Sequence, residues 1–289
     1  MILPRFELAE PGSVTEACDI LHRDEKAKII AGGTDLLVNM KRKVTKADLL
    51  VSLAGVRELR SLSFSNGATL ALGPMVTVAE VAESPPIRTS FPVLAKAAGK
   101  LGSSQIRNRA TIGGNVCTAR PASDAIGPLI AYEATVEISS PRGTRTELIA
   151  NIFKGPGQTT VGRDEILSSI SLNRPAANTG GSYVKYTIRN AMEIALVSVT
   201  TLVTLDRGVC RSARVVLGAV APTFVRCPAT EQFLVGKKIT EDVAEKAGHL
   251  VIDACSPITD VRASADYRRK LVEILVKRSL VEAAANSVK

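Results

Sequence analysis

Two short glycine segments decide the fold, Lys28–Leu36 (KIIAGGTDL) and Ala110–Asn115 (ATIGGN). In the first, the β-type run Lys28–Ala31 is followed by Gly32-Gly33 and by a short predicted helix. Paired glycines allow positive φ angles and a close approach of the backbone to a ligand, and a helix N-terminus adds partial positive charge. This arrangement suits a bound pyrophosphate. A strand-to-helix turn needs glycine for its geometry as well, so an ordinary turn is the alternative.

The second segment ends a polar, cationic stretch, Gly102–Asn115, which has no helical or strand periodicity and is predicted to be a long loop. Long ordered loops in compact domains are commonly functional. Thr111 offers a hydroxyl and Asn115 an amide beside the Gly113-Gly114 backbone. Two glycine loops that converge on one ligand would supply many hydrogen-bond donors. The alternative is a pair of unrelated turns.

The composition describes an ordinary globular protein. Its 289 residues predict two domains, or one domain with an appendage, and 45% of them are hydrophobic. Because only 3% are aromatic and Trp is absent, a cofactor ring is expected to rest on aliphatic side chains and backbone. The same scarcity argues against single-stranded nucleic-acid binding, which depends on aromatic stacking. The net charge of +9 favours an acidic partner or an anionic ligand, or is a solvated basic surface.

The cysteines exclude a locally built metal site. All five are scattered and no CxxC pair exists, so neither a zinc knuckle nor a ferredoxin-type cluster is expected. An odd number of unpaired cysteines fits a reducing compartment. The N-terminus lacks the apolar region of a signal peptide, and no apolar run of about 18 residues occurs. Together these features predict a cytoplasmic protein without a transmembrane segment.

The order of predicted elements divides the chain into two parts. The first alternates helices and strands and ends at a linker-like window, Asn173–Ser182. The second has strands first and helices afterwards, which is typical of an α+β domain. The predicted helices are a segment from Val14 capped by Ser13, Asp35–Lys41, Phe91–Leu101, Asp124–Glu133, Ile239–Ala254 and Ser264–Ala284. The predicted strands are Lys28–Ala31, Asp48–Leu53, Ala68–Leu72, Ala134–Ser140, Glu165–Leu172, Tyr183–Arg189, Ala195–Asp206 and Val209–Ala219.

Several common sites are missing from the sequence. It has neither the G-x-G-x-x-G fingerprint of a dinucleotide fold nor a G-x-x-x-x-G-K-[ST] phosphate loop. The only histidines, His22 and His249, lie in predicted helices and are interpreted as surface or cap residues rather than bases or ligands. No nucleophile elbow is present. No catalytic residue and no metal ligand is therefore predicted in this chain.

Six segments in a fixed order resemble a known family over essentially the whole chain. They resemble the FAD-binding medium subunit of the molybdenum hydroxylases, the xanthine dehydrogenase and aerobic carbon monoxide dehydrogenase family. Besides the two glycine segments they are Thr118–Asp124 (TARPASD), Asp164–Leu167 (DEIL), Tyr183–Ala195 (YVKYTIRNAMEIA) and Arg262–Arg268 (RASADYR).

The resemblance implies an α+β fold. A two-subdomain FAD-binding domain of the vanillyl-alcohol-oxidase (PCMH) type would span residues 1–176, with subdomains at about 1–56 and 57–176. A smaller C-terminal α+β domain with an antiparallel sheet would span residues 177–289.

The resemblance also implies a set of FAD-binding residues. The pyrophosphate would lie against Ala31, Gly32, Gly33, Thr34 and Asp35, with Thr111, Gly114 and Asn115 closing from the other side. Ser123 and Asp124 would reach the ribityl or flavin end, although on residue type alone each is as well explained as a helix cap. Ile166 and Leu167 would border the adenine or the ring, and Lys185 would approach the isoalloxazine. Lys28, Ile29 and Ile30 would line the entry strand. The further residues expected around the cofactor are Leu36, Leu101, Ile106, Ala110 and Cys117.

Three departures from the family stand out. Arg120 replaces a small residue, often Ser, before the proline, which would reshape the flavin edge or add a partner contact. The four-cysteine insert that gives some relatives an additional iron–sulfur cluster is missing, so no such cluster is expected. The aromatic that some relatives place against the flavin is not evident near Met192–Ile194.

The implied function is electron transfer in a heterotrimeric oxidoreductase. FAD in this chain would accept electrons from the [2Fe–2S] clusters of a small subunit, while a large subunit with a molybdopterin cofactor oxidises the substrate. The expected assembly is a dimer of heterotrimers without nucleic acid. The final acceptor, whether NAD, quinone or oxygen, stays open, as does the substrate. The alternatives are a self-standing flavin oxidase or reductase of the same fold, and a nucleotide-binding module without redox function.

Overall fold

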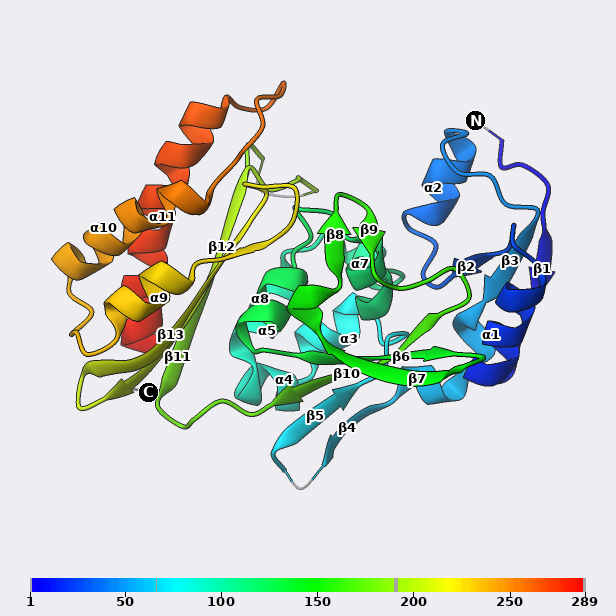
Figure 1. Ribbon diagram of the computed structural model, residues 1–289, viewed down its shortest axis with the longest axis horizontal. Coiled ribbons are helices and arrows are strands. Elements are labelled where there is room, and N and C mark those ends of the chain that lie inside the picture. The colour runs from blue at the N-terminus through cyan, green and yellow to red at the C-terminus, as the bar shows by residue number, and fades with distance from the viewer. Residues whose placement is uncertain (1, 66, 190–191, 288–289) are drawn as a thin grey trace.

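The computed structural model describes residues 2–65, 67–189 and 192–287. Its elements form three parts that lie side by side in Figure 1: an N-terminal subdomain at the right, a middle subdomain, and a C-terminal domain at the left. The N-terminal and middle subdomains each combine one sheet with helices, and the C-terminal domain carries an antiparallel sheet with helices. The α+β fold class is therefore confirmed.

The N-terminal subdomain is a small parallel sheet with one helix on it. The strands are ordered β1-β3-β2, with bounds Glu7–Ala9, Leu49–Ser52 and Lys28–Ile30. Helix α1 (Val14–Arg23) begins at Ser13, whose hydroxyl accepts a hydrogen bond from the Glu16 amide at 3.1 Å, as its sequence pattern predicts. The Gly32-Gly33 turn and helix α2 (Leu36–Lys41) connect β2 to β3. The predicted β-loop-α-β unit is confirmed.

The middle subdomain is an antiparallel sheet with helices. Its strand order is β4-β5-β10-β6-β7, with bounds Leu62–Ser65, Thr69–Leu72, Ile166–Asn173, Thr135–Ser140 and Gly143–Leu148. The helices are α3 (Val78–Glu83), α4 (Pro85–Ser90), α5 (Pro92–Gly99), α6 (Ser104–Arg107), α7 (Ile112–Thr118) and α8 (Ile126–Ala131). A two-stranded hairpin, β8 (Phe153–Gly155) and β9 (Gln158–Thr159), lies beside α7 in Figure 1. Edge strand β7 was missed in the sequence because its side chains are mostly exposed and polar.

The prediction that Gly102–Asn115 is a loop was wrong. The segment contains α6 and the start of α7, which span only four and seven residues and are too short to show a helical period. Each helix is started by a side-chain cap. Ser103 Oγ accepts a hydrogen bond from the Ile106 amide at 3.3 Å, and Thr111 Oγ1 accepts one from the Gly114 amide at 3.1 Å.

The C-terminal domain is a four-stranded antiparallel sheet covered on one face by helices. The strands, in sheet order, are β11 (Thr179–Tyr186), β12 (Val197–Asp206), β13 (Val209–Gly218) and β14 (Val225–Arg226). The helices are α9 (Pro228–Leu234), α10 (Glu241–Leu250) and α11 (Ala265–Asn286), and α11 contacts β11 and β12. Helices α5 and α8 of the middle subdomain contact β11 to β13. The sheet therefore joins the two domains. Short 3-10 turns occur at Leu53–Gly55, Arg57–Arg60, Ile149–Asn151 and Ile252–Ala254.

The linker-like window Asn173–Ser182 is shorter than predicted, because β10 ends at Asn173 and β11 begins at Thr179. Its glycines serve close packing rather than flexibility. A Cβ at Gly180 would lie 2.1 Å from the Ala283 carbonyl oxygen of α11, and a Cβ at Gly181 would lie 2.4 Å from Val93 Cγ2. The same composition therefore marks a tight junction between the domains. Within the described residues, no helix is both long and apolar enough to cross a membrane.

Candidate cofactor site

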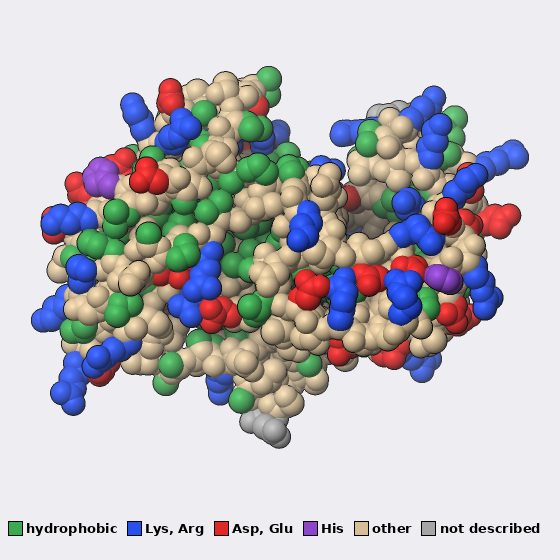
Figure 2. All heavy atoms as spheres, in the orientation of Figure 1, with side chains coloured by type: hydrophobic (Ala, Val, Ile, Leu, Met, Phe, Trp, Pro, Cys, Tyr) green, Lys and Arg blue, Asp and Glu red, His purple; other side chains and the backbone are tan. Residues whose placement is uncertain are grey.

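A cavity of about 1130 Å³ lies where the three parts of the molecule meet. Figure 2 shows the surface hollowed beside the lobe that carries α2. The walls come from the first glycine loop and α2, from α7 and the segment after it, from residues 159–167, and from Lys185 and several loops of the C-terminal domain. Segments from both ends of the sequence thus face one space.

The cavity brings together nearly all the residues singled out in the sequence. Lys28 and Ile30 are not among its walls: Lys28 is exposed, and Ile30 packs against the cluster around Met40 and Leu50. The singled-out residues that line it are Ile29, Ala31, Gly32, Gly33, Thr34, Asp35, Leu36, Leu101, Ile106, Ala110, Thr111, Gly114, Asn115, Cys117, Ser123, Asp124, Ile166, Leu167 and Lys185. Asn190 and Ala191 of the YVKYTIRNAMEIA segment lie outside the described residues.

The first glycine loop presents bare backbone to the cavity. A Cβ at Gly32 would lie 1.9 Å from the Arg109 carbonyl oxygen, so no side chain fits there, and Gly33 has a φ of +75°. The amide N–H groups of Gly32, Gly33 and Thr34 donate to no acceptor among the described residues. These three residues are half-buried and line the cavity, so their free N–H groups are available to a ligand with acceptor atoms. A pyrophosphate supplies such atoms.

The second glycine segment has a different construction. Its amides are used within the protein: Ile112 donates to the Val76 carbonyl, Gly113 to the Pro74 carbonyl, and Gly114 to the Thr111 hydroxyl. A Cβ at Gly113 would lie 2.3 Å from Pro74 Cβ, so glycine is needed for packing. The idea that both loops offer amide donors to the ligand is therefore wrong for this one.

What the second segment does offer is Asn115. Its Oδ1 atom is buried and accepts no hydrogen bond from the described residues, and the side chain lines the cavity. A buried polar group without a partner costs about 1–3 kcal/mol. A ligand with hydroxyl or N–H donors at this position would remove that cost. FAD has both kinds of donor, so the site fits it.

A buried ion pair stands on the wall nearest the C-terminal domain. Lys185 Nζ lies 2.9 Å from Asp124 Oδ2, and the two side chains are 8% and 6% exposed. The Tyr183 hydroxyl donates to Asp124 Oδ1 at 2.7 Å. Burial raises the pKa of Asp124, and Lys185 and the two hydrogen bonds act in the opposite direction. Neither Ser123 nor Asp124 caps α8, whose N-cap position is Ala125. The helix-cap alternative for these two residues is thereby excluded.

Cys117 is the only cysteine on the cavity wall among the described residues. Its surface is open to the cavity, yet the surrounding walls desolvate the thiol and raise its pKa to about 12. Because the thiolate is the nucleophile, the raised pKa keeps the thiolate fraction low at neutral pH. The site therefore offers no activated sulfur for covalent attachment of a cofactor.

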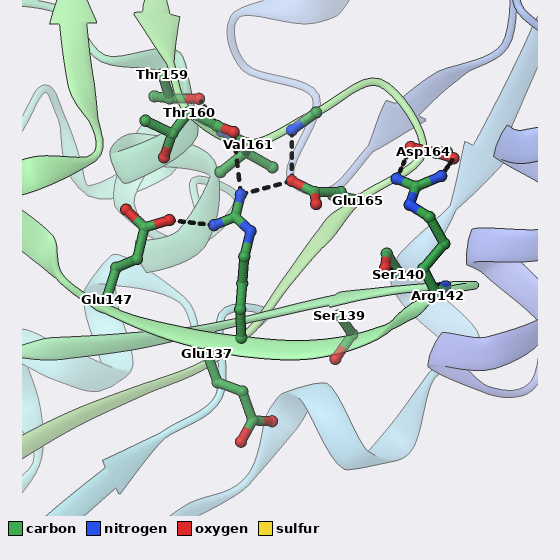
Figure 3. A network of polar contacts seen from close by, with 12 residues as sticks. Glu137, Ser139, Ser140, Arg142, Glu147, Thr159, Thr160, Val161, Asp164 and Glu165 are labelled. Atoms are coloured by element: carbon green, nitrogen blue, oxygen red, sulfur yellow. Dashed lines mark hydrogen bonds and ion pairs between the residues drawn. The ribbon is translucent and has the colours of Figure 1, made fainter.

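A network of carboxylates and arginines holds the wall at residues 159–165 (Figure 3). Arg145 binds Glu165 at 2.7 Å and the Thr160 carbonyl at 3.0 Å, and it also pairs with Glu147. Beside it, Asp164 accepts hydrogen bonds from Arg142 at 2.8 and 3.1 Å and contacts His22 Nδ1 at 2.9 Å. These partners, Arg142 first, hold the pKa of Asp164 well below its usual range.

The two histidines lie on the surface, as interpreted from the sequence. The side chains of His22 and His249 are 57% and 60% exposed and contact Asp164 and Glu273.

The wall from the C-terminal domain combines exposed apolar side chains with buried arginine. Met192, Ile194 and Ile258 face the cavity and are more than half exposed. Arg268 is 1% exposed and binds the Leu196 carbonyl at 2.6 Å and Asp260 at 2.9 Å. Arg268 thus fastens the loop at Asp260 to the start of β12. No aromatic side chain lines the cavity among the described residues.

Some cavity residues were not singled out in the sequence. Arg42 and Asn39 of α2 face the cavity because the helix follows the first glycine loop directly. Glu165 belongs to the DEIL segment, and Arg262 and Arg268 belong to RASADYR, so their segments were recognised although their positions in the site were not. Arg120, which the sequence marks as a departure from the family, also lines the cavity and forms no side-chain hydrogen bond or ion pair with the described residues.

Two family models cover most of the chain. Residues 4–175 match the FAD binding domain in molybdopterin dehydrogenase, and residues 182–283 match the CO dehydrogenase flavoprotein C-terminal domain. The chain is 32% identical over 287 residues to the nicotine 6-hydroxylase medium subunit of Paenarthrobacter nicotinovorans, covering 99% of this chain and 100% of the relative. It is 30% identical over 274 residues to the xanthine dehydrogenase FAD-binding subunit of Escherichia coli O157:H7, covering 94% of each.

A solved structure agrees with these matches. The chain superposes on a chain of the carbon monoxide dehydrogenase from Hydrogenophaga pseudoflava with a TM-score of 0.96 at 33% identity, covering 99% of both chains. The sequence segments, the cavity with its unsatisfied glycine-loop amides and the two domain matches all agree. This chain belongs to the family of FAD-binding medium subunits of the molybdenum hydroxylases, the oxidoreductases that include xanthine dehydrogenase and carbon monoxide dehydrogenase.

Proposed function

We propose that the cavity holds one FAD, and that this chain passes electrons from an iron–sulfur subunit to a final acceptor. The observation that carries the proposal is the match of opposite hydrogen-bonding needs on two walls of one space. Gly32, Gly33 and Thr34 present unsatisfied amide donors, and Asn115 presents a buried acceptor without a partner. The pyrophosphate of FAD would accept hydrogen bonds from the glycine-loop amides, and a sugar hydroxyl or ring N–H group of FAD would donate to Asn115.

In this arrangement each part of the chain has a separate task. The first glycine loop binds the pyrophosphate, Ile166 and Leu167 lie against the adenosine end, and the Asp124–Lys185 pair faces the isoalloxazine end. When bound, FAD supplies one- and two-electron redox chemistry, and the protein supplies binding, orientation and electrostatics. Because Tyr183 also donates to Asp124 and Lys185 also donates to the Lys100 carbonyl, the pair is held in place and keeps a fixed dipole at the ring. We place the domain boundary at 176/177, in the connection between β10 and β11.

The partners follow from the relatives. We propose a small subunit with [2Fe–2S] clusters and a large molybdopterin subunit, assembled as a dimer of heterotrimers. The relatives' names support such an assembly: one is the medium subunit of a nicotine 6-hydroxylase, and another is a carbon monoxide dehydrogenase medium chain. The net charge of +9 favours docking to acidic partner surfaces. Under this proposal substrate oxidation belongs to the large subunit.

The first test is the cofactor content of the purified full chain. We expect one FAD per chain, seen as flavin absorbance and identified by mass after release. The second test is electron flow in the co-expressed complex, in which substrate should reduce the flavin only when both other subunits are present. A colourless chain that does not take up added FAD would contradict the proposal. Substrate turnover by the isolated chain would instead favour a self-standing flavin enzyme.

A further inference from the structure

One oxygen of the Glu165 carboxylate accepts hydrogen bonds from the protein, and the other accepts none from the described residues. Its Oε2 atom accepts the Gly162 amide at 2.7 Å and Arg145 at 2.7 Å. Its Oε1 atom accepts no hydrogen bond from the described residues, and it is not enclosed by the protein. Glu165 lines the cavity, while its side chain is only 14% exposed. An ionised acceptor therefore stands in the cavity wall with half of its capacity unused.

The surrounding contacts fix the position of this carboxylate. The Glu165 amide donates to the Gly162 carbonyl at 3.2 Å, and the Gly162 amide donates back to the side chain, so the turn is closed in both directions. Arg145 holds Glu165 and the Thr160 carbonyl with the same nitrogen, as Figure 3 shows. A group held on both sides loses little further conformational entropy when a ligand binds.

Arg145 also removes an electrostatic obstacle. A carboxylate in the same cavity as a pyrophosphate would repel it if it stood alone. The guanidinium lies 2.7 Å from Oε2 and is shared with Glu147, so it offsets part of the charge of Glu165 and leaves Oε1 free as an acceptor. A carboxylate with a cation beside it and one free oxygen suits a sugar hydroxyl, a donor without charge. In dinucleotide folds an acidic residue binds a ribose hydroxyl by the same chemistry.

The place of Glu165 in the fold selects the adenosine ribose. Glu165 precedes β10 at the end next to α1, and the neighbouring Ile166 packs in the core of the N-terminal subdomain. The C-terminal domain, which carries Lys185, lies on the opposite side of the middle subdomain in Figure 1. Because the flavin ring is assigned to the Lys185 end, the sugar that reaches Glu165 belongs to the other half of the cofactor.

We propose that Glu165 Oε1 accepts a hydrogen bond from a ribose hydroxyl of the adenosine half of FAD, and that Arg145 acts as its positioning residue. This assignment rests on the proposed function. It makes the site selective for a ribonucleotide at the adenosine end. It also predicts that Glu165 and Arg145 act as one unit, because without Arg145 the carboxylate keeps only the Gly162 amide as a partner and loses its neighbouring cation.

The test asks whether the full chain, freed of flavin, distinguishes ADP from analogues that lack one ribose hydroxyl. It compares the wild type with two variants. Calorimetry measures the binding of ADP, 2′-deoxy-ADP and 3′-deoxy-ADP to the wild type, to Glu165→Ala and to Glu147→Ala. The wild type should bind ADP about tenfold more tightly than one of the deoxy analogues, as expected for a hydrogen bond to a charged acceptor. Glu165→Ala should lose this preference. Glu147→Ala should keep it, because Glu147 contacts the same arginine but does not line the cavity.

Two further variants separate recognition from folding. Glu165→Gln keeps the size of the side chain, and Arg145→Met removes the positioning cation; both should reduce the preference for ADP at an unchanged secondary-structure content. Equal binding of all three nucleotides by the wild type, or a preserved preference in Glu165→Ala and Glu165→Gln, would overturn the proposal. So would a wild type that binds FAD but not ADP. A wild type that does not bind FAD would instead overturn the proposed function itself.

Discussion

The two glycine segments look alike in sequence and are built differently. The first leaves the amides of Gly32 and Gly33 without acceptors among the described residues, whereas the second uses the amides of Gly113 and Gly114 inside the protein. Both pairs contain a glycine that packing requires, Gly32 against the Arg109 carbonyl and Gly113 against Pro74, so the difference between the segments lies in the use of their amides. A Gly-Gly pair therefore indicates a close approach, and only the hydrogen bonds around it tell whether a ligand or another part of the protein makes it.

The largest effect is expected from Gly32→Ala. The new Cβ would lie 1.9 Å from the Arg109 carbonyl, a backbone atom that cannot move without displacing the second segment. We expect loss of FAD binding and a decrease of about 1–3 kcal/mol in the free energy of unfolding, as for other overpacked sites. Flavin content and urea denaturation measure the two effects. The control is Gly99→Ala, where the nearest atom outside the helix is 4.0 Å away; full flavin binding by Gly32→Ala would show that the first loop is an ordinary turn.

Asn115→Ala should affect binding and stability in opposite directions. The variant removes the buried acceptor that we assign to a cofactor donor, so FAD affinity should fall about tenfold. The flavin-free chain should keep its stability or gain slightly, because an unsatisfied buried atom is removed and alanine favours the helix. Thermal unfolding with and without FAD separates the two effects. A loss of stability in the flavin-free form would mean that Asn115 serves the fold rather than the ligand.

Thr111→Ala tests whether the second segment is mainly a helix start. The variant loses the acceptor for the Gly114 amide, so stability should fall by about 1 kcal/mol. Thr111→Ser keeps the hydroxyl and should restore most of that loss. Denaturant titration of the flavin-free proteins is the measurement. If Thr111→Ala leaves stability unchanged and weakens only FAD binding, the cap interpretation is wrong.

The smallest expected effect concerns Cys117 of α7 and is a change in the pH dependence of its alkylation rate. With a thiol pKa of about 12, the thiolate fraction should keep rising about tenfold per pH unit across the range in which an ordinary cysteine levels off. Alkylation of the flavin-free chain, followed by mass spectrometry, should therefore accelerate steadily up to pH 10, and Cys117→Ser should remove the signal. A plateau near pH 9 would show that the cavity wall does not desolvate this thiol.

The parts of the site that lie within one short segment could be predicted from the sequence, and the contacts between distant segments could not. Lys28–Leu36 carries its own strand, turn and helix, so its structure followed from local pattern alone. The two domains, by contrast, were suggested by the order of elements and by the family resemblance. Asp124 and Lys185 were singled out separately, but nothing local showed that burial would bring them together at 2.9 Å.

Other features depend on tertiary contacts that leave no local pattern. Arg145 reaches Glu165 across 20 residues of sequence, and neither the polar strand β7 nor the predicted strand Glu165–Leu172 indicates which partner each charge has. Helices α6 and α7 exist because Ser103 and Thr111 cap them and the core covers them, not because of repeated apolar positions. Gly180 and Gly181 were interpreted as a linker since their composition is the same whether a chain is free or tightly packed.

The contact between Gly32 and the Arg109 carbonyl has a consequence for how the protein is made. The first loop is synthesised long before residue 109, so on the ribosome it lacks the neighbour that defines its shape. Domains generally fold as units during synthesis. The cavity is completed only when Lys185 of β11 and Arg268 of α11 have emerged. A chain that ends before Arg268 therefore lacks part of the cavity wall.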